Sequence, residues 1–315
     1  MTLARLRSRL LTIAALTAFG GGVRAEDSTW LGAFSDSFPA VSPDGATVLF
    51  QSDRGGHGAI FAASTSGGPA RVLVDTGDHP TQPSWSPDQS HIAFVADVNG
   101  QQEIFIVRAD GAERRRLTFE PGADYHPRFS LDGARLFFNS ARGAGSRPTG
   151  ASAAWGQDIY SIGLDGQDLQ RHTHCPVSCT YPALSPDGRT LAYRESLPRP
   201  GLTQDGQAAA LDSEIMVADL SGGPARSISD SPAFDAWPAW SPDGRRLYFG
   251  SRRGAGPGLI FRADLNGGLV QPVTQTLDTD RFPAVSPDGR TLYFVRHIIR
   301  SGAILGVLSQ QAIAP

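Results

Sequence analysis

The sequence predicts an all-β protein, a six-bladed β-propeller of four-stranded blades whose last blade is closed by the N-terminal strand. Three observations support this prediction: a sixfold Ser-Pro-Asp-Gly motif, four short strand patterns in each repeat, and a composition rich in turn residues. The 36 Gly and 23 Pro are spread along the 315-residue chain, which suits many short strands joined by turns.

The motif sets the number of blades. It recurs at intervals of 44, 44, 55, 56 and 45 residues, with Gln in place of Gly in one copy and Leu in place of Pro in another. The copies begin at Ser42, Ser86, Ser130, Ser185, Ser241 and Ser286. Proline fixes φ at the second turn position and glycine tolerates the left-handed exit, so each copy predicts a tight turn between two strands. Repeats of this length with four strands each are typical of propeller blades.

The two ends of the repeat region predict how the ring closes. Ile304 lies 18 residues after Ser286, the same spacing that separates Ile60 from Ser42, so the sixth unit is expected to hold three strands and lack a fourth. Counting 12 residues back from Ser42, the spacing found in the other units, reaches Trp30 within 28–31. We expect this N-terminal strand to complete the last blade and so remove an open sheet edge.

The N-terminus predicts export. Three arginines precede a short apolar run, residues 10–19, and Val23-Arg24-Ala25 resembles a signal-peptidase site. The run is too short to span a bilayer well. We expect residues 1–25 to be a cleaved signal peptide, residues 26–315 to be one domain, and the protein to be periplasmic or secreted. Cleavage leaves 24 of the 28 basic residues against 31 acidic ones, a net charge of −7, which disfavours nucleic acid and anionic membranes as partners.

The repeat P-x-[WFVL]-S-P-D-G, followed by an Ile-Phe or Ile-Tyr strand and an Asp-Gly turn, resembles the TolB-type propeller, a WD40-like repeat family, over nearly all of residues 28–309. The resemblance implies a periplasmic protein of the Tol–Pal envelope system. TolB proteins also carry an N-terminal α/β domain that contacts an inner-membrane partner, whereas here the predicted signal peptide leads directly into the predicted closing strand. The resemblance therefore implies the propeller and its compartment more strongly than the Tol role.

Sequence motifs for catalysis are missing. The chain has no G-x-S-x-G, no H-E-x-x-H and no phosphate-binding loop, and we predict no catalytic residue, no cofactor and no metal. The Asp of each Ser-Pro-Asp-Gly is expected to bond its own turn backbone. Cys175 and Cys179 follow His172 and His174, and such a cluster could hold zinc. A disulfide between the two cysteines is favoured, because the spacing is not that of a zinc finger and exported proteins are oxidised.

The candidate site is a ring of residues at the start of each first strand. One residue per unit precedes Pro or its equivalent: Phe38, Gln82, His126, Tyr181, Trp237 and Phe282. Two positions earlier, four units carry an aspartate and the other two carry Pro80 and Cys179; the aspartates are Asp36, Asp124, Asp235 and Asp280. Since first strands line the channel of a propeller, we predict that these residues ring one channel mouth and bind a partner. The alternative is that the aromatic residues pack the blade core and the aspartates cap the entering turns.

Two insertions point to the same face. Units three and four carry long segments between their second and third strands, residues 141–155 and 197–211. Strands alternate in direction, so these segments and the cysteine loop emerge on the face where first strands begin. Long irregular segments are commonly functional or disordered.

The leading hypothesis is a monomeric, non-enzymatic binding or scaffold propeller that engages an envelope protein or peptide at this mouth. A propeller enzyme of the glycan lyase or hydrolase type is the alternative, with His126 and Asp124 as its acid/base pair. A third alternative is a cation held by the aspartate ring.

Overall fold

The computed structural model describes residues 34–143, 156–196, 212–254, 256–266, 269–300 and 303–314. All of them belong to one compact unit, residues 33–315. The strands, in chain order, are β1 (Asp36–Val41), β2 (Thr47–Ser52), β3 (Ala59–Ser64), β4 (Arg71–Val74), β5 (Thr81–Trp85), β6 (His91–Val98), β7 (Gln101–Arg108), β8 (Arg115–Arg116), β9 (Asp124–Phe129), β10 (Arg135–Ser140), β11 (Asp158–Gly163), β12 (Gln170–Arg171), β13 (Ser178–Leu184), β14 (Thr190–Ser196), β15 (Ser213–Asp219), β16 (Arg226–Ser227), β17 (Asp235–Trp240), β18 (Arg246–Ser251), β19 (Leu259–Asp264), β20 (Gln271–Pro272), β21 (Thr279–Val285), β22 (Thr291–Arg300) and β23 (Ala303–Ala312). No helix among these residues has the length and hydropathy needed to cross a membrane.

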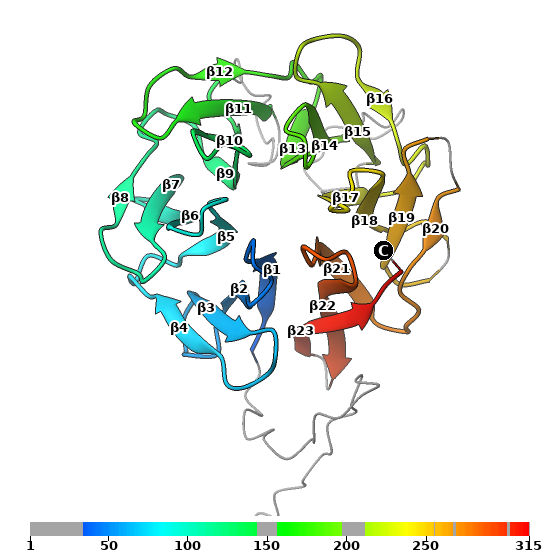
Figure 1. Cartoon of the computed structure of the whole chain (residues 1–315), viewed down its shortest axis with the longest axis horizontal. Coiled ribbons are helices and arrows are strands. Elements are labelled where there is room, and N and C mark those ends of the chain that lie inside the picture. The colour runs from blue at the N-terminus through cyan, green and yellow to red at the C-terminus, as the bar shows by residue number, and fades with distance from the viewer. Residues whose placement is uncertain are drawn as a thin grey trace, which may run out of the picture. The chain divides into compact units, whose positions relative to one another are not determined.

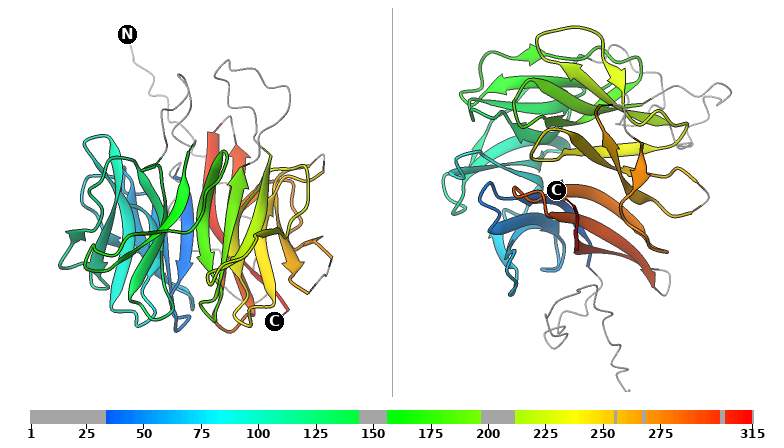
Figure 2. Two further views of the ribbon diagram at one scale, coloured as in Figure 1. Left: turned by 90° about the horizontal axis from the view of Figure 1, so that it is seen from above. Right: turned by 45° about the vertical axis from the view of Figure 1, so that its right-hand side comes forward.

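The strands form a six-bladed β-propeller, with the first strand of each blade nearest the central axis (Figure 1). Five blades are four-stranded antiparallel sheets, and β21–β23 form a three-stranded sheet in the described part of the chain. Neighbouring strands of a blade are antiparallel, so all first strands begin on one face of the ring and end on the opposite face (Figure 2). We call the face where first strands begin the strand-one face, and the face with the Ser-Pro-Asp-Gly turns the turn face.

The Ser-Pro-Asp-Gly turns are held by their own side chains. In the first copy, Ser42 Oγ donates to Asp44 Oδ1 over 2.6 Å, and the same carboxylate oxygen accepts a bond from the Ala46 amide. Gly45 follows with φ of +73°, a conformation that favours glycine. The Ser-to-Asp bond recurs in all six turns. The prediction that these aspartates are structural is confirmed.

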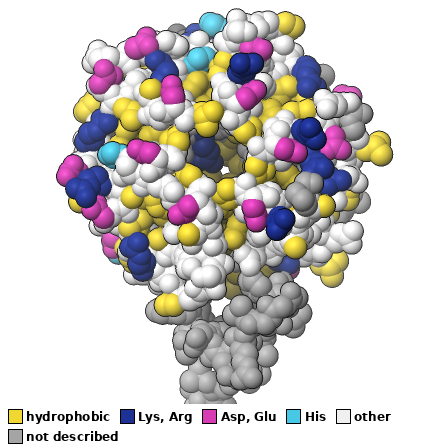
Figure 3. Space-filling model, in the orientation of Figure 1, with side chains coloured by type: hydrophobic (Ala, Val, Ile, Leu, Met, Phe, Trp, Pro, Cys, Tyr) yellow, Lys and Arg dark blue, Asp and Glu magenta, His cyan; other side chains and the backbone are white. Residues whose placement is uncertain are grey.

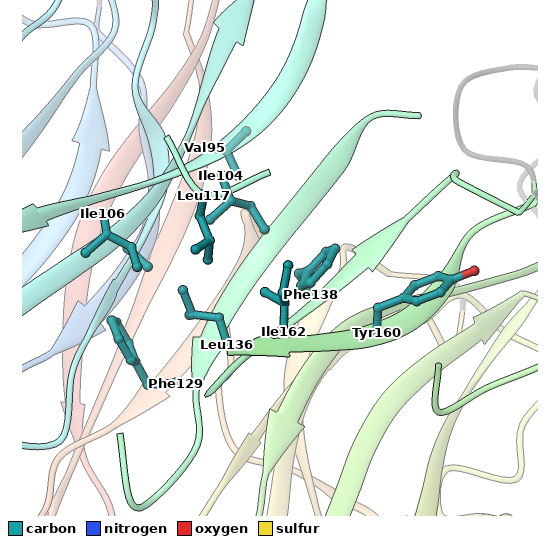
Figure 4. Close-up of a cluster of buried hydrophobic side chains, with 10 residues drawn as sticks. Val95, Ile104, Ile106, Leu117, Phe129, Leu136, Phe138, Tyr160 and Ile162 are labelled. Atoms are coloured by element: carbon teal, nitrogen blue, oxygen red, sulfur yellow. The ribbon is translucent and has the colours of Figure 1, made fainter. Parts of the chain in front are cut away.

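The hydrophobic core lies between neighbouring blades. Alternate residues of a strand point to opposite faces of its sheet, so each blade packs against the blade on either side. Figure 4 shows one such layer, in which Ile104 and Ile106 of β7 meet Leu136 and Phe138 of β10, and all four side chains are at most 1% exposed. Burial of both faces of every blade explains why the second and third strands read as nearly continuous apolar runs.

The sixth blade differs from the sequence-based prediction. Ile60 pairs with Gln51 of β2, and the corresponding residue of β22, Val295, pairs with Leu308. Leu308 therefore occupies the third-strand core position, while Ile304 lies near the tip of a longer hairpin and is 62% exposed. The predicted third strand is present as β23, but the predicted match of Ile304 to Ile60 was wrong, because the spacing argument assumed a short connection between strands. The predicted closing strand, 28–31, lies outside the described residues; Ser35, just after it, forms a parallel bridge with Gly306 of β23.

Candidate functional site

The six residues that precede Pro share one unusual backbone conformation. Each has a positive φ, between 52° and 61°: Phe38, Gln82, His126, Tyr181, Trp237 and Phe282. The pairing of the first and second strands shifts register at this position in every blade. Bulky residues seldom adopt positive φ, and a bulge re-aims a side chain, so the fold repeats a strained bulge six times. The bulges bring five of these side chains to the lining of one central cavity, together with four of the prolines that follow them and Arg128.

Five of the six side chains form a closed ring of aromatic contacts. Going round the axis, the ring centroids lie 5.8 Å apart for Phe38–His126, 4.0 Å for His126–Tyr181 and 6.0 Å for Tyr181–Trp237. The circle closes through Phe282, 4.6 Å from Trp237 and 4.4 Å from Phe38. The space left between them is about 30 Å³, room for a few waters at most. We call these five residues the aromatic ring; they pack across the channel rather than into the blade cores.

Gln82 and Asn139 hold the ring together by hydrogen bonds. The Gln82 side-chain oxygen accepts a 2.6 Å bond from the His126 amide, which links the second blade to the third. His126 Nδ1 donates to Asn139 Oδ1 over 2.8 Å, and that oxygen also accepts a bond from the Tyr181 amide. Burial lowers the pKa of His126 to about 3, despite the opposing bond to Asn139. His126 is thus a neutral packing and hydrogen-bonding group near neutral pH.

We expect the His126 imidazole to stay neutral between about pH 5 and pH 8, where an unperturbed histidine titrates. Because its folded-state pKa is lowered below the unfolded value, His126 contributes to stability above pH 6.5, and that contribution is lost as the pH falls from 6.5 towards 3. Histidine ring resonances followed by NMR test this. A His126 midpoint above pH 5 would contradict it and reopen an acid/base role.

The four aspartates are buried rather than displayed at the mouth. Asp36, Asp124, Asp235 and Asp280 are at most 2% exposed. Each pairs with an arginine of its own blade at 2.6–2.9 Å: Arg54, Arg142, Arg253 and Arg296, respectively. The carboxylates are thus unavailable to a partner, and a cation would have to displace a guanidinium. The described residues contain no group of three or more His, Cys, Asp or Glu that could hold a metal ion.

Asp124 and His126 do not form an acid/base pair in this structure. The Asp124 carboxylate bonds Arg142, whereas His126 bonds Asn139. Burial raises the pKa of Asp124 to about 6, and the charge of Arg142 opposes that rise. The raised pKa belongs to a buried ion pair inside the blade, and it needs no catalytic explanation.

The arginine of these ion pairs follows a pattern that sequence reasoning missed. In three blades it is the last residue of a Ser-x-Arg triplet at the end of the second strand, 12 residues after the motif serine. The triplet serine accepts a bond from the arginine Nε at 3.0, 2.8 and 2.9 Å in Arg54, Arg142 and Arg253. Each guanidinium also lies over aromatic rings of strands two and three, as Arg253 does over Phe249 and Phe261. The triplet could have been found by aligning the repeats.

A second set of arginines lacks such partners. Arg194, Arg252 and Arg281 lie on the strand-one face of blades four, five and six, and none forms an ion pair with a carboxylate of the described residues. We call them the mouth arginines. Arg128, further along the channel, donates to the Pro127 carbonyl, and burial lowers its pKa to about 10, so it remains charged at neutral pH. Figure 3 shows the turn face, where basic side chains are visible inside the central opening.

A disulfide bond joins Cys175, in the loop between β12 and β13, to Cys179, the second residue of β13. Cys179 is fully buried against Phe137 and Tyr193, and it occupies the position that aspartate holds in four other blades. His172 Nε2 contacts Ser161 Oγ at 2.8 Å instead of a cysteine. Of the predicted loops, residues 144–155 and 197–211 lie outside the described residues.

We expect alkylation of the unreduced protein to label neither cysteine, and reduction to expose both. The disulfide also predicts that the purified protein contains no stoichiometric zinc. Zinc near one equivalent, with thiols that become reactive on chelation, would contradict this assignment.

Another cavity, of about 530 Å³, lies on the turn face between blades four and five. Its carboxylates include Asp187 and Asp243, which are held in their Ser-Pro-Asp-Gly turns; the serine bonds lower the pKa of both. Since these groups already accept bonds from their own turns, we place the candidate site at the strand-one mouth.

Comparison with known proteins agrees with the six-bladed propeller fold. The sequence profile of the TolB beta propeller domain matches residues 71–198 and 201–311. The chain belongs to the TolB β-propeller family. Two curated relatives match shorter stretches: the Protein TolB homolog of Chlorobium luteolum is 32% identical over 131 residues, and the uncharacterized peptidase YuxL of Bacillus subtilis is 30% identical over 121 residues. These cover 32% and 38% of this chain, but only 30% and 16% of the respective relatives.

Solved structures show the same fold as this TolB-family chain. TolB from Acinetobacter baumannii aligns with a TM-score of 0.62 and 23% identity, over 79% of this chain and 56% of that one. The putative TolB from Agrobacterium tumefaciens aligns with a TM-score of 0.62 and 22% identity, over 84% of this chain and 91% of that one. An oligogalacturonate lyase in complex with manganese aligns with a TM-score of 0.59 and 15% identity, over 85% of this chain and 73% of that one. At these identities the likeness establishes the propeller architecture alone, which is shared by binding proteins and enzymes.

Proposed function

We propose that this chain is a non-catalytic binding or scaffold propeller that engages a protein or peptide partner at the strand-one mouth of its channel. The aromatic ring carries the proposal. Its side chains line a cavity of only about 30 Å³ on the channel axis, which favours docking of a larger partner at a mouth. Trp237 and Tyr181 are only half-buried, and such aromatic residues commonly anchor interfaces.

The β22–β23 hairpin adds an apolar surface on the same face. Beyond the pair Val295–Leu308, the hairpin continues for five more cross-strand pairs. Two of these pairs, Ile298–Leu305 and Ile299–Ile304, join large apolar residues. Ile299 and Ile304 are 71% and 62% exposed. In Figure 2 the hairpin rises from the face where β1 begins. Exposed isoleucines gathered at one tip favour contact with another protein.

Family membership supports the same proposal. The TolB relatives make an exported envelope protein the natural context, and we extend this to periplasmic or secreted localisation, cleavage after Ala25 and a link to Tol–Pal-type function. The enzyme alternative draws support from the lyase and peptidase likenesses, but His126 and Asp124, the pair that the sequence offered for it, bond to other groups.

The proposal is tested by capture from envelope extract with the mature protein. The variant Ile299→Ser/Ile304→Ser is expected to lose the captured partner. Leu131→Ser is the matched control, because Leu131 is 57% exposed but lies in a turn on the opposite face. Equal capture by both variants would place the interface elsewhere. Intact mass of the periplasmic form should begin at Glu26, and a full-length cytoplasmic product would contradict the localisation.

A further inference from the structure

Positive charge gathers on the strand-one face of blades four to six. The Arg194 and Arg252 guanidinium carbons lie 4.7 and 5.4 Å from the centroid of the same ring, Phe234. Phe234 is 5.6 Å from Trp237, and Arg281 lies 5.8 Å from the Trp237 ring. The three mouth arginines thus surround one pair of aromatic rings beside the channel.

These charges are not neutralised by the described residues. Arg54, Arg142, Arg253 and Arg296 each bind a buried aspartate, whereas the mouth arginines form no ion pair with a described carboxylate. Burial lowers the pKa of Arg281, and the nearby charge of Arg252 lowers it further. Burial also lowers the pKa of Arg194. Holding like charges together at partial desolvation is unfavourable for folding, which is typical of groups retained for a ligand.

Buried donors in this cluster also lack acceptors. Arg194 Nε, Arg281 Nε and Trp237 Nε1 are buried and make no hydrogen bond with any residue that the structure describes. The other ionisable neighbours are Tyr181, which faces Arg194 and Arg281, and His297 on the hairpin. The pKa of His297 is lowered to about 4, first by burial and then by Arg281, so it adds no positive charge at neutral pH. Two of these donors belong to guanidinium groups, for which a carboxylate is the strongest acceptor, and the third is an indole N–H that any oxygen acceptor satisfies.

The mouth arginines depart from the repeat. At the blade positions of Arg281 and Arg194, the first blade has Ser37 and Gln51 instead. A blade can therefore form without arginine at these positions. The mouth arginines on three adjacent blades are not part of the interactions that recur from blade to blade.

We propose that the mouth arginines bind the carboxylate side chains of an acidic peptide segment whose apolar residues pack on Trp237 and Phe234. The apolar character follows from the rings among the cations and from the exposed isoleucines of the neighbouring hairpin. This inference rests on the proposed function, since it assigns the chemistry of the partner at the same mouth.

The test is calorimetric titration of the mature protein with acetyl-Glu-Phe-Glu-Leu-Glu-amide and with its Gln-for-Glu counterpart. We expect the acidic peptide to bind and the neutral one to bind at least about tenfold more weakly, since one charge-assisted bond accounts for such a factor. Arg281→Met and Arg194→Met should each weaken binding of the acidic peptide by a similar factor. Arg245→Met is the matched control, because Arg245 is exposed and lies in a Ser-Pro-Asp-Gly turn on the turn face, away from the mouth.

Thermal melting distinguishes a binding role from a structural one. Without peptide, Arg281→Met and Arg194→Met should melt at or above the temperature of the parent, because each removes an unpaired charge; a lower melting temperature would overturn the inference. Equal binding of the neutral peptide, or full binding by the arginine variants, would also overturn it. Stronger binding of inorganic phosphate or of oligogalacturonate than of the peptide would assign the site to another anion and reject the peptide. Partner capture that depends on Ile299 and Ile304 but not on the arginines would leave the proposed function standing while this inference fails.

Discussion

Replacing Arg253 with methionine is expected to lower the free energy of unfolding by about 3–5 kcal/mol at neutral pH, because it leaves a buried carboxylate without its partner. Asp235 is fully buried and bonds Arg253 Nη2 at 2.9 Å. Methionine keeps much of the apolar contact with Phe249 and Phe261 while it removes the charge. Urea or guanidinium denaturation of the folded variant and of the parent measures the difference.

Arg252→Met is the matched control for Arg253→Met. Arg252 is adjacent and exposed, pairs with no described carboxylate, and is expected to change stability by no more than about 0.5 kcal/mol. The loss should also depend on pH. Burial raises the pKa of Asp235, and without Arg253 that pKa rises further, so the penalty for the charged carboxylate is present at neutral pH and relieved as the pH falls through the raised value. A loss shared equally by both variants, or one that grows on acidification, would contradict the ion-pair explanation.

Trp237→Ala is expected to lower the free energy of unfolding by about 3–5 kcal/mol, because it removes one member of the aromatic ring and leaves a cavity. Trp237 lies within 6.0 Å, centroid to centroid, of Tyr181, Phe234 and Phe282. If it also anchors a partner, the same substitution weakens that complex by about 2 kcal/mol or more. Both quantities are measured on the folded variant, by denaturation and by titration. Unchanged stability with lost affinity would mean that Trp237 contacts the partner without supporting the ring.

Gly250 gives this experiment an internal control. A Cβ added at Gly250 would lie 2.6 Å from Trp237 Cε3, so Gly250→Ala should destabilise the parent by steric overlap. In the Trp237→Ala background the overlap disappears, and Gly250→Ala should be neutral or stabilising there. Equal effects in both backgrounds would show that the two residues do not pack together.

The repeats made the fold predictable, whereas the site depended on contacts between repeats. The serine spacing was enough to predict six blades, because each turn is held by residues within the motif, as in Ser42 and Asp44. The same spacing misplaced Ile304, because a hairpin can lengthen by whole cross-strand pairs without disturbing the core. The positions of the pre-proline residues predicted a ring about the channel, which the structure shows for the aromatic members.

The aspartates show the limit of reasoning from residue type. Their recurrence in four of the six units suggested a charged mouth, but Asp124 and Asp235 are buried and pair with arginines that follow the second strands. A single sequence does not reveal which side chain of a bulged strand faces the axis, since the bulge reverses the usual alternation. The mouth arginines were missed for the opposite reason, because Arg194 and Arg281 occur outside any motif and gather only when three blades are folded.

The bonds that join the first blade to the last have a consequence for the order of folding. The Leu308 amide donates to Asp36 Oδ2 across 272 residues of chain, next to the bridge between Ser35 and Gly306. Contacts of such sequence separation form slowly, because the chain entropy lost in closing the loop is recovered only when the ring is complete. Each interior blade can pack on its predecessor as soon as it is made. The first blade must wait for β23, so ring closure is expected to be the last and slowest folding step.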